Sequence, residues 1–280
     1  MDHSPIPEPS PTFLEAPDGP FEVPPTCASA GVELSLVLPA FREASNIQSV
    51  LEAASAVLRK VDGLQFEIIV VDDNSPDNTA VLAWEASLQL PEVRVVRRIH
   101  EKGLATAVIR GWQVSRGRIL AVMDADLQHP PEVLSALLDA IRGGADLAVA
   151  SRHVAQGGVS DWSAFRRVIS RTAQMIGLIL LAGVVGKVRD PMSGYFMLRR
   201  EVIAGRRLDP TGYKILIEVI ARGKAGRVSE IGYVFRERRE GVSKISAKVY
   251  LQYLQHLLRL RGAVIRDSRL VRSVLGAPRA

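Results

Sequence analysis

Two carboxylates separated by one residue follow a strongly apolar run in the middle of the chain. The run covers residues 119–123, and the acids are Asp124 and Asp126. Such a run is typical of a strand buried on both faces, and ligands bind at the carboxyl ends of strands in open parallel sheets. Mg²⁺ is commonly held by one or two carboxylates together with substrate phosphates. The pair therefore indicates a metal and nucleotide site, although an Asp after a strand is also a common turn or capping residue.

Composition and charge divide the chain into an acidic leader and a basic remainder. With 47% apolar and 24% charged residues, the 280 residues are able to bury a large core. Residues 1–30 contain eight of the sixteen prolines, five acids and no Lys or Arg, which predicts disorder there. The rest has 36 basic and 25 acidic groups, a net charge of +11 that attracts phosphates, nucleic acid or an anionic membrane. The single cysteine, Cys27, excludes a disulfide framework and fits a reducing compartment.

Alternating strand and helix patterns must position the two acids. We predict strands at residues 34–38, 66–71, 93–96, 119–123 and 146–150, with the first closed by Pro39. Helical patterns follow Ala44, Leu104 and the Pro130-Pro131 pair. This alternation predicts an α/β protein with a Rossmann-like, mostly parallel sheet flanked by helices. Polar residues then lie past the carboxyl ends of strands: Glu43, Asp72, Asp73, Asp124, Asp126 and Arg152.

Two common designs for binding a nucleotide are excluded. A dinucleotide-binding protein needs a glycine-rich turn after its first strand, and residues 39–43 contain no glycine. A Walker-type lysine loop is also missing from the sequence. The pyrophosphate must be neutralised in another way, and a metal on Asp126 would do so.

Ordered motifs along the chain carry a family resemblance. LPAFRE at 38–43, VVDDNSPDNT at 70–79 and MDADLQHPP at 123–131 together resemble the inverting family 2 glycosyltransferases with the GT-A fold. More narrowly, four further motifs resemble the polyprenol (dolichol) phosphate mannosyltransferases: SR at 151–152, RRVISR at 166–171, DPMSGYF at 190–196 and RREGVSK at 238–244. The resemblance covers about residues 32–260.

The resemblance implies a reaction, a cofactor and a donor site. The reaction is inverting, metal-dependent transfer of mannose from GDP-mannose to a polyprenyl (dolichyl) phosphate, which gives polyprenyl phosphate mannose and GDP. The cofactor is Mg²⁺ or Mn²⁺, with Asp126 and Gln128 as ligands. The implied donor-binding residues are Pro39, Phe41, Glu43, Val71, Asp73, Asp124, Ala125, Asp126, Arg238 and Lys244. The simpler interpretation of residues 72–76 is an Asx turn. Arg42 departs from the family, in which Asn is common at this position.

The acceptor is implied to be held by cations. Arg152, Arg166 and Ser170 match the family's acceptor-phosphate contacts, and with Asp124 and Asp126 they make up the implied catalytic set. A phosphate monoester has a second pKa of about 6 and is largely dianionic at neutral pH, so it needs no general base. His129, which precedes two prolines, is expected to be a turn or surface residue rather than a base or ligand.

These observations predict the organisation of the chain. We expect a disordered proline-rich leader over 1–31, a GT-A glycosyltransferase domain over 32–262 and a basic C-terminal tail over 263–280. Segments 162–185 and 250–260 combine apolar and basic residues, as amphipathic helices at a membrane interface do, but packing in a core or dimer explains 175–185 equally well. The apolar segment 175–186 is shorter than the roughly 20 residues of a spanning helix. We expect a cytoplasmic protein bound peripherally to the inner face of the membrane.

Two other functions stay open at this point. The donor is a UDP-sugar such as UDP-glucose in the first, because motif spacing does not specify the sugar or the base. The second is a basic nucleic-acid-binding α/β protein, whose binding would depend steeply on salt. Carboxylates at strand ends repel phosphates unless a metal intervenes, so no nucleic-acid partner is expected. The retained pair of acids likewise disfavours a non-catalytic relative, and the sequence does not indicate an oligomeric state.

Overall fold

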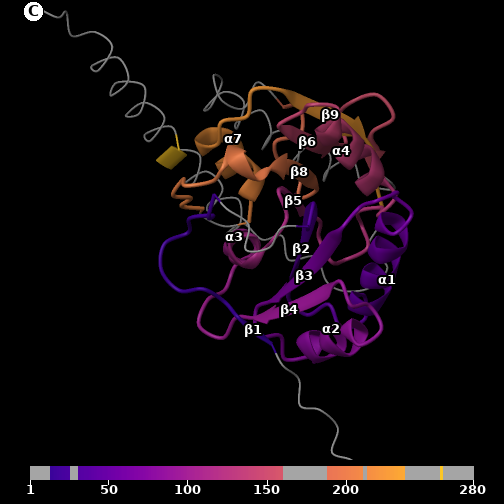
Figure 1. Ribbon diagram of the computed structural model, residues 1–280, viewed down its shortest axis with the longest axis vertical. Helices are drawn as coiled ribbons and strands as arrows, with labels where there is room; N and C mark the ends of the chain where they lie inside the picture. Colours follow the sequence, from indigo (N-terminus) through magenta and orange to yellow (C-terminus); the bar gives the residue numbers. More distant parts are fainter. Residues whose placement is uncertain (1–12, 26–30, 160–187, 211–212, 237–258, 261–280) are drawn as a thin grey trace, which may run out of the picture.

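The computed structural model describes residues 13–25, 31–159, 188–210, 213–236 and 259–260. Within them, eight strands form one sheet in the order β1-β4-β3-β2-β5-β8-β6-β9 (Figure 1). The strands are β1 (Leu14–Glu15), β2 (Leu34–Ala40), β3 (Phe66–Asp72), β4 (Val93–Arg97), β5 (Ile119–Val122), β6 (Leu147–Ser151), β8 (Phe196–Arg199) and β9 (Val228–Gly232). A separate small sheet pairs β7 (Gly158–Val159) with β10 (Val234–Phe235).

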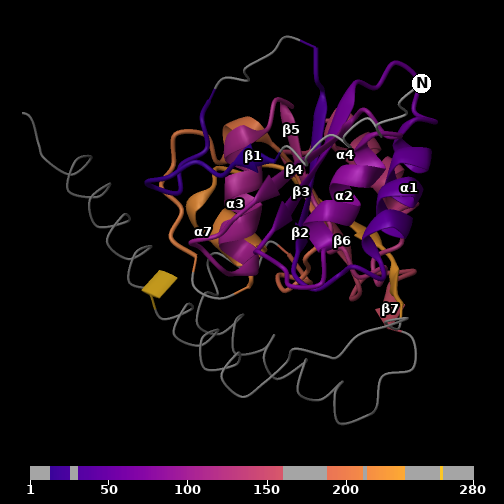
Figure 2. The ribbon, with the colours of Figure 1, turned by 90° about the horizontal axis from the view of Figure 1, so that it is seen from below.

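Helices cover both faces of the main sheet. Helices α1 (Ile47–Leu58), α2 (Thr79–Ser87) and α4 (Val133–Arg142) lie on one face, and α3 (Leu104–Val114) and α7 (Ile215–Arg222) lie on the other (Figure 2). The short 3-10 helix η1 (Arg200–Val202) follows β8 directly. This arrangement confirms the predicted α/β fold with a mostly parallel sheet between helices.

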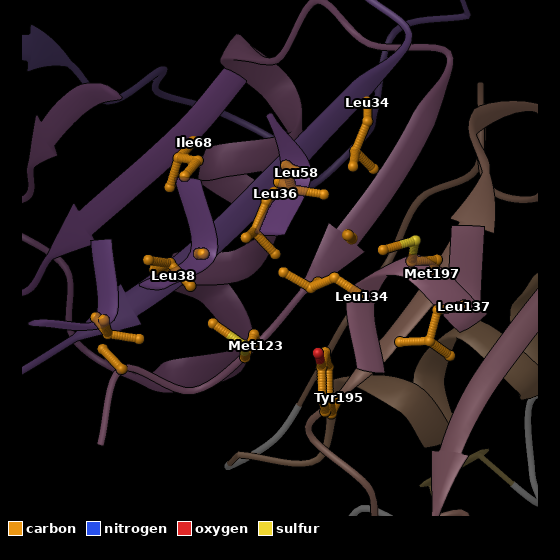
Figure 3. Packing of buried hydrophobic residues seen from close by; sticks show 14 of the residues in the cluster. Leu34, Leu36, Leu38, Leu58, Ile68, Met123, Leu134, Leu137, Tyr195 and Met197 are labelled. Carbon is orange, nitrogen blue, oxygen red and sulfur yellow. The ribbon is translucent and has the colours of Figure 1, made fainter. Parts of the chain in front are cut away.

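Each face of the sheet has its own hydrophobic cluster. Side chains alternate along β2, so Leu36 packs toward α1 and α4 while Val37 packs toward α3. Figure 3 shows Leu36 close to Leu58 of α1, with Leu134 of α4 in the same cluster. The central strands read as continuous apolar runs because both of their faces are buried.

Pro39 lies inside β2 rather than closing it. The strand continues to Ala40, whose carbonyl accepts a hydrogen bond from the Asp73 N–H at 3.1 Å. The backbone polar groups of Val37 point instead toward β5, because its carbonyl accepts a hydrogen bond from the Met123 N–H at 3.2 Å. Those of Pro39 point the same way, because this direction repeats at every second residue of a strand. The ladder with β5 stops at Val37 and Val122, so the missing proline N–H removes no ladder hydrogen bond.

One strand runs against the others and was not predicted from the sequence. β8 is antiparallel to both of its neighbours, with Phe196 level with Val122 of β5 and Val149 of β6. It therefore begins at the edge of the sheet where its neighbours end. The segment that leads into it, from Asp190 to Tyr195, reaches the same edge as the residues that follow β5 and β6.

Part of the proline-rich leader packs on the sheet, which corrects the expectation of disorder for residues 13–25. β1 pairs with β4, and Val23 is fully buried. The Arg110 guanidinium carbon lies 4.4 Å from the centre of the Phe21 ring, and Arg110 donates to the Gly19 carbonyl at 3.1 Å. Composition alone misses this because a few apolar side chains are enough to dock a short extended segment.

The predicted interface helices and tail lie mostly outside the described residues. Residues 160–187, 237–258 and 261–280 are not described, and the expected boundaries at 31 and 262 stay predictions. No helix in the part of the chain that is described has both the length and the apolar character needed to cross a membrane.

The packing of the leader is testable at Val23. We expect Val23→Ala to lower the free energy of unfolding by about 2 kcal/mol, because it removes buried methyl groups and leaves a cavity. Val234→Ala is the matched control, since Val234 is 50% exposed and its truncation is expected to change stability by less than about 0.5 kcal/mol. Chemical denaturation measures both values. Equal stabilities for the two variants would show that residues 13–25 do not pack on the sheet.

Candidate active site

The turn after β5 is held at both of its ends. Met123 is fully buried, and Figure 3 shows it in the core cluster near Tyr195. At the next residue, the Asp124 N–H donates to Nδ1 of His129 at 3.2 Å. Leu127 adopts a left-handed backbone conformation with φ of 59°, which lets the chain reverse within the turn. Asp124 and Asp126 are thus presented from a constrained turn and not from a mobile loop.

His129 is a buried support beneath this turn, which corrects the expectation of a surface residue. Its side chain is 2% exposed and stacks on Tyr195, with ring centres 5.1 Å apart. The edges of Tyr233 and Phe235 complete the aromatic surroundings. Burial lowers the pKa of His129 from 6.5 to about 4, so the imidazole is neutral at pH 7 and Nδ1 is its acceptor.

Asp126 and Gln128 face a second segment of chain. Both residues are almost fully buried, and the Gln128 N–H donates to Oδ1 of Asp126 at 3.2 Å. Nε2 of Gln128 donates to the Arg236 carbonyl at 3.0 Å, and the backbone carbonyl of Gln128 accepts from the Arg236 N–H at 3.0 Å. Since Nε2 is used in this way, Oε1 is the atom of the amide suited to bind a cation.

An ion pair connects the end of β6 with the segment that enters β8. Arg152 donates from Nε and Nη2 to the two oxygens of Asp190, each at 2.8 Å, and from its backbone N–H at 3.0 Å. Burial on its own would raise the pKa of Asp190, but the hydrogen bonds and charge of Arg152 hold that pKa below its usual value. The pair fixes the guanidinium of Arg152 near Asp124, in the turn over residues 124–128 that we call the acid turn.

Gly194 allows the entry segment to approach Asp124 closely. A Cβ atom at Gly194 would lie 3.0 Å from Oδ2 and 3.2 Å from Oδ1 of the Asp124 carboxylate. Ser193 and Tyr195 hold the same segment, because the Ser193 hydroxyl donates to the Ala150 carbonyl at 2.7 Å and the Tyr195 hydroxyl to the Pro130 carbonyl at 3.1 Å. The sequence analysis included Ser193, Gly194 and Tyr195 in the DPMSGYF motif but gave none of these three residues a role of its own.

The predicted nucleoside-binding residues lie in the last residues of β2 and β3 and in the turns that follow them. Glu43 is 7% exposed, and its Oε2 accepts from Nδ2 of Asn46 at 2.9 Å. Asp73 is paired with Arg98 and accepts from the Gly103 N–H at 2.7 Å. Val71 and Pro39 are buried level with each other in the two strands.

The neighbouring Asp72 fits the simpler Asx-turn interpretation. Its oxygens accept hydrogen bonds from the N–H and the hydroxyl of Ser75. This buried acid therefore shapes the turn after β3.

Arg42 occupies a backbone conformation that suits the family's asparagine. Its φ is 58°, in the left-handed region that Asn tolerates better than most side chains. Its N–H donates to the Ser75 hydroxyl at 3.0 Å, and its guanidinium carbon lies 5.4 Å from the centre of the Phe41 ring. The Lys102 ammonium lies 5.9 Å from the same ring, so two cations flank Phe41.

Four of the predicted site residues cannot be placed. Arg166, Ser170, Arg238 and Lys244 lie outside the described residues. The structure brings Asp124, Ala125, Asp126, Gln128 and Arg152 to one edge of the sheet. It puts Pro39, Phe41, Glu43, Val71 and Asp73 on β2 and β3 or just after them, one and two strands from β5 along that edge.

The donor set of the turn fits a hard divalent cation. A carboxylate from Asp126 and an amide oxygen from Gln128 are oxygen ligands of the kind that Mg²⁺ and Mn²⁺ prefer. Among the described residues, no cluster of three or more His, Cys, Asp or Glu side chains forms a site made of protein ligands alone. A cation here would therefore take further oxygens from phosphates and water, as nucleotide-bound Mg²⁺ does.

A comparison with protein families finds a match that includes the site residues. Residues 35–206 match the model of glycosyl transferase family 2, a span that contains the acid turn, Arg152 and Asp190. The chain belongs to glycosyl transferase family 2. Members of this family are glycosyltransferases, so the chain is an enzyme of that class, and the edge described above is its candidate active site.

Curated relatives match most of the chain. A protein named dolichol-phosphate mannosyltransferase from Pyrococcus furiosus is 44% identical over 82% of this chain, and the match spans 64% of its own length. A protein of the same name from Saccharomyces cerevisiae is 35% identical over 82% of this chain and 87% of its own length. A polyprenol monophosphomannose synthase from Mycolicibacterium smegmatis is 39% identical over 75% of this chain and 80% of its own length.

Solved structures of low sequence identity share the fold. Glucosyl-3-phosphoglycerate synthase from Mycobacterium tuberculosis, solved with Mn²⁺, UDP-glucose and phosphoglyceric acid, superposes with a TM-score of 0.62 at 22% identity over 83% of this chain and 80% of that one. A protein described only as mycobacterial has a TM-score of 0.64 at 24% identity, covering 83% of this chain and 75% of its own. These likenesses confirm the GT-A type of α/β fold for family members such as this chain.

The close approach of Gly194 to Asp124 gives a first prediction for the site. Gly194→Ala places a methyl group against the Asp124 carboxylate and displaces it, and we expect glycosyl transfer to fall roughly ten to a hundredfold in kcat/KM. Gly158→Ala is the control, because a Cβ there meets no atom within 4 Å. Steady-state kinetics of both variants test this, and equal activities would contradict the assigned position of Asp124.

The buried, neutral His129 predicts a pH dependence of stability. Between pH 6.5 and about 4 the unfolded chain binds a proton at His129 while the folded chain does not, so stability falls as pH falls through this window. We expect this group to contribute a loss of about 1.4 kcal/mol per pH unit, a contribution that is missing in His129→Gln. Chemical denaturation at several pH values measures the difference in slope. Identical slopes in both proteins would mean that His129 is solvated when folded.

Proposed function

We propose that this chain transfers mannose from GDP-mannose to a polyprenyl phosphate with inversion at the sugar. The observation that carries the proposal is the match to three mannosyl-transferring relatives over three quarters or more of the chain. The geometry supports it, because the acid turn suits a nucleoside diphosphate with a cation, and Arg152 suits an anionic acceptor beside it. The donor nucleotide and the metal are part of the proposal, with Mg²⁺ or Mn²⁺ as the cofactor.

In this mechanism the acceptor is its own nucleophile. A phosphate oxygen of the lipid attacks C1 of mannose from the face opposite the leaving group. The bond between C1 and the diphosphate breaks, and GDP departs with the electron pair. Because the monoester is largely dianionic at neutral pH, no proton has to be removed from it. The neutral, buried His129 is accordingly a support of the turn, not a base.

The protein's residues divide the remaining work. Asp126 and Gln128 would hold the cation, which when bound supplies Lewis-acid stabilisation of the negative charge on the leaving diphosphate. Arg152, fixed by Asp190, orients the acceptor phosphate beside Asp124. Glu43 and Asp73, in the turns after β2 and β3 that lie one and two strands from β5, face the nucleoside end of the donor.

A lipid acceptor requires access to a membrane surface. The prenyl chain stays in the bilayer while its phosphate enters the site, so we propose peripheral attachment at the inner face of the membrane. The basic excess after Arg236 suits an anionic surface.

The proposal is tested by sugar transfer with defined substrates. Purified protein is mixed with a short-chain polyprenyl phosphate in detergent and with radiolabelled GDP-mannose or UDP-glucose, and the labelled lipid is counted. We expect mannose transfer that stops on chelation and resumes with Mg²⁺ or Mn²⁺. Preferential use of UDP-glucose would show that the donor is a UDP-sugar and not GDP-mannose. Full activity after chelation would contradict the proposed metal requirement.

Asp126 provides the matching variant. Asp126→Ala is expected to reduce transfer to the background level, because it removes the only carboxylate assigned to the cation. Asp62→Asn is the control, since Asp62 is exposed in the turn after α1 and its change is expected to leave transfer intact. Normal transfer by Asp126→Ala would contradict the role of the acid turn.

A further inference from the structure

Lys214 lies at the acceptor side of the site, although no sequence motif pointed to it. It directly precedes α7, and its ammonium donates to the Met192 carbonyl at 2.8 Å. Met192 belongs to the segment that enters β8, between Asp190, which holds Arg152, and Gly194, where a Cβ atom would lie against the Asp124 carboxylate. The charge of Lys214 interacts with those of Arg152, Asp124 and Asp190.

This position is unfavourable for a lysine in terms of stability alone. Lys214 is the N-cap residue of α7, a position that favours Ser, Thr, Asp or Asn, and its charge lies at the positive end of the helix dipole. Burial, together with the charge of Arg152, lowers its pKa to about 8, which still leaves the ammonium largely protonated at pH 7. Residues that break local stability rules in this way are expected at functional sites.

The place of Lys214 along the sheet edge indicates which substrate it meets. The predicted nucleoside-binding residues lie at the carboxyl ends of β2 and β3. Lys214 instead contacts the segment that precedes β8, the strand between β5 and β6 in the sheet. This is the half of the edge that also contains Arg152. A dianionic phosphate there needs more positive charge than Arg152 supplies, because Asp190 already compensates that guanidinium.

We propose that Lys214 is a further acceptor-binding residue, whose ammonium contacts the phosphate of the polyprenyl phosphate together with Arg152. The proposal rests on the proposed function and deepens it. An ammonium has three N–H donors. Within the described residues the Met192 carbonyl accepts a hydrogen bond from one of them, and the ammonium also lies 4.3 Å from the centre of the Tyr213 ring. The Met192 contact positions Lys214, and the remaining donors suit phosphate oxygens.

The test separates acceptor binding from donor binding. We expect Lys214→Gln to raise the KM for a short-chain polyprenyl phosphate roughly ten to a hundredfold, because one charge-assisted hydrogen bond to the phosphate is lost. The KM for GDP-mannose is expected to stay within about threefold of the original value. Lys214→Arg keeps the charge and is expected to recover most of the acceptor affinity. Lys224→Gln is the matched control, because Lys224 is exposed just past the other end of α7.

A binding measurement provides a readout besides turnover. Thermal unfolding is recorded with GDP plus Mn²⁺ and, separately, with farnesyl phosphate. We expect Lys214→Gln to be stabilised by GDP as the original protein is, but not by farnesyl phosphate. If the glutamine variant does not fold, Lys214→Met, which keeps most of the side-chain volume, gives the same comparison.

The outcomes distinguish this proposal from the function on which it rests. An unchanged acceptor KM, or a rise confined to the GDP-mannose KM, would overturn the role of Lys214 while mannose transfer stands. Failure of the original protein to transfer any sugar to polyprenyl phosphate would instead overturn the proposed function.

Discussion

The buried ion pair between Arg152 and Asp190 is the interaction on which the site depends. Arg152 follows a strand that runs toward the site edge, and Asp190 precedes β8, which runs away from it. The side chain of Asp190 is 1% exposed, so removal of either partner would leave a charge without compensation, at a cost of about 3–5 kcal/mol. The pair thus ties the entry segment of β8, and with it Gly194 and the Met192 carbonyl, to the end of β6.

The reversed strand explains how acids and cations come to share one edge. The acid turn and Arg152 follow parallel strands, whose carboxyl ends meet at this edge. Because β8 is antiparallel, the segment that precedes it, residues 190–195, reaches the same edge. The Asp124 N–H then donates to His129, and the missing side chain of Gly194 leaves space beside the Asp124 carboxylate. Within the described residues, the acid turn and Arg152 are each held by a contact of their own, through His129 for the turn and through Asp190 for the guanidinium.

The sequence predicted the parallel strands closely and the site only in part. Buried parallel strands are continuous apolar runs, so β2, β3 and β5 were predicted to within two residues. The four residues of β8 are too few to show a pattern, and their reversed direction comes from pairing with distant strands. His129 was misjudged because its aromatic partners lie far along the chain, and Lys214 was missed because a lysine before an apolar helix carries no local signal. The acid turn was identified because its residue types alone indicate its chemistry.

In the proposed mechanism, a cation on the acid turn holds the donor diphosphate beside a cationic acceptor site. The most direct measurement is a crystal structure with GDP-mannose and Mn²⁺, with the metal located from its anomalous scattering. We expect one Mn²⁺ ligated by the Asp126 carboxylate, the Gln128 amide oxygen and the diphosphate, with the mannose toward Arg152. A bound nucleotide whose Mn²⁺ lies away from Asp126, or whose sugar points away from Arg152, would contradict it.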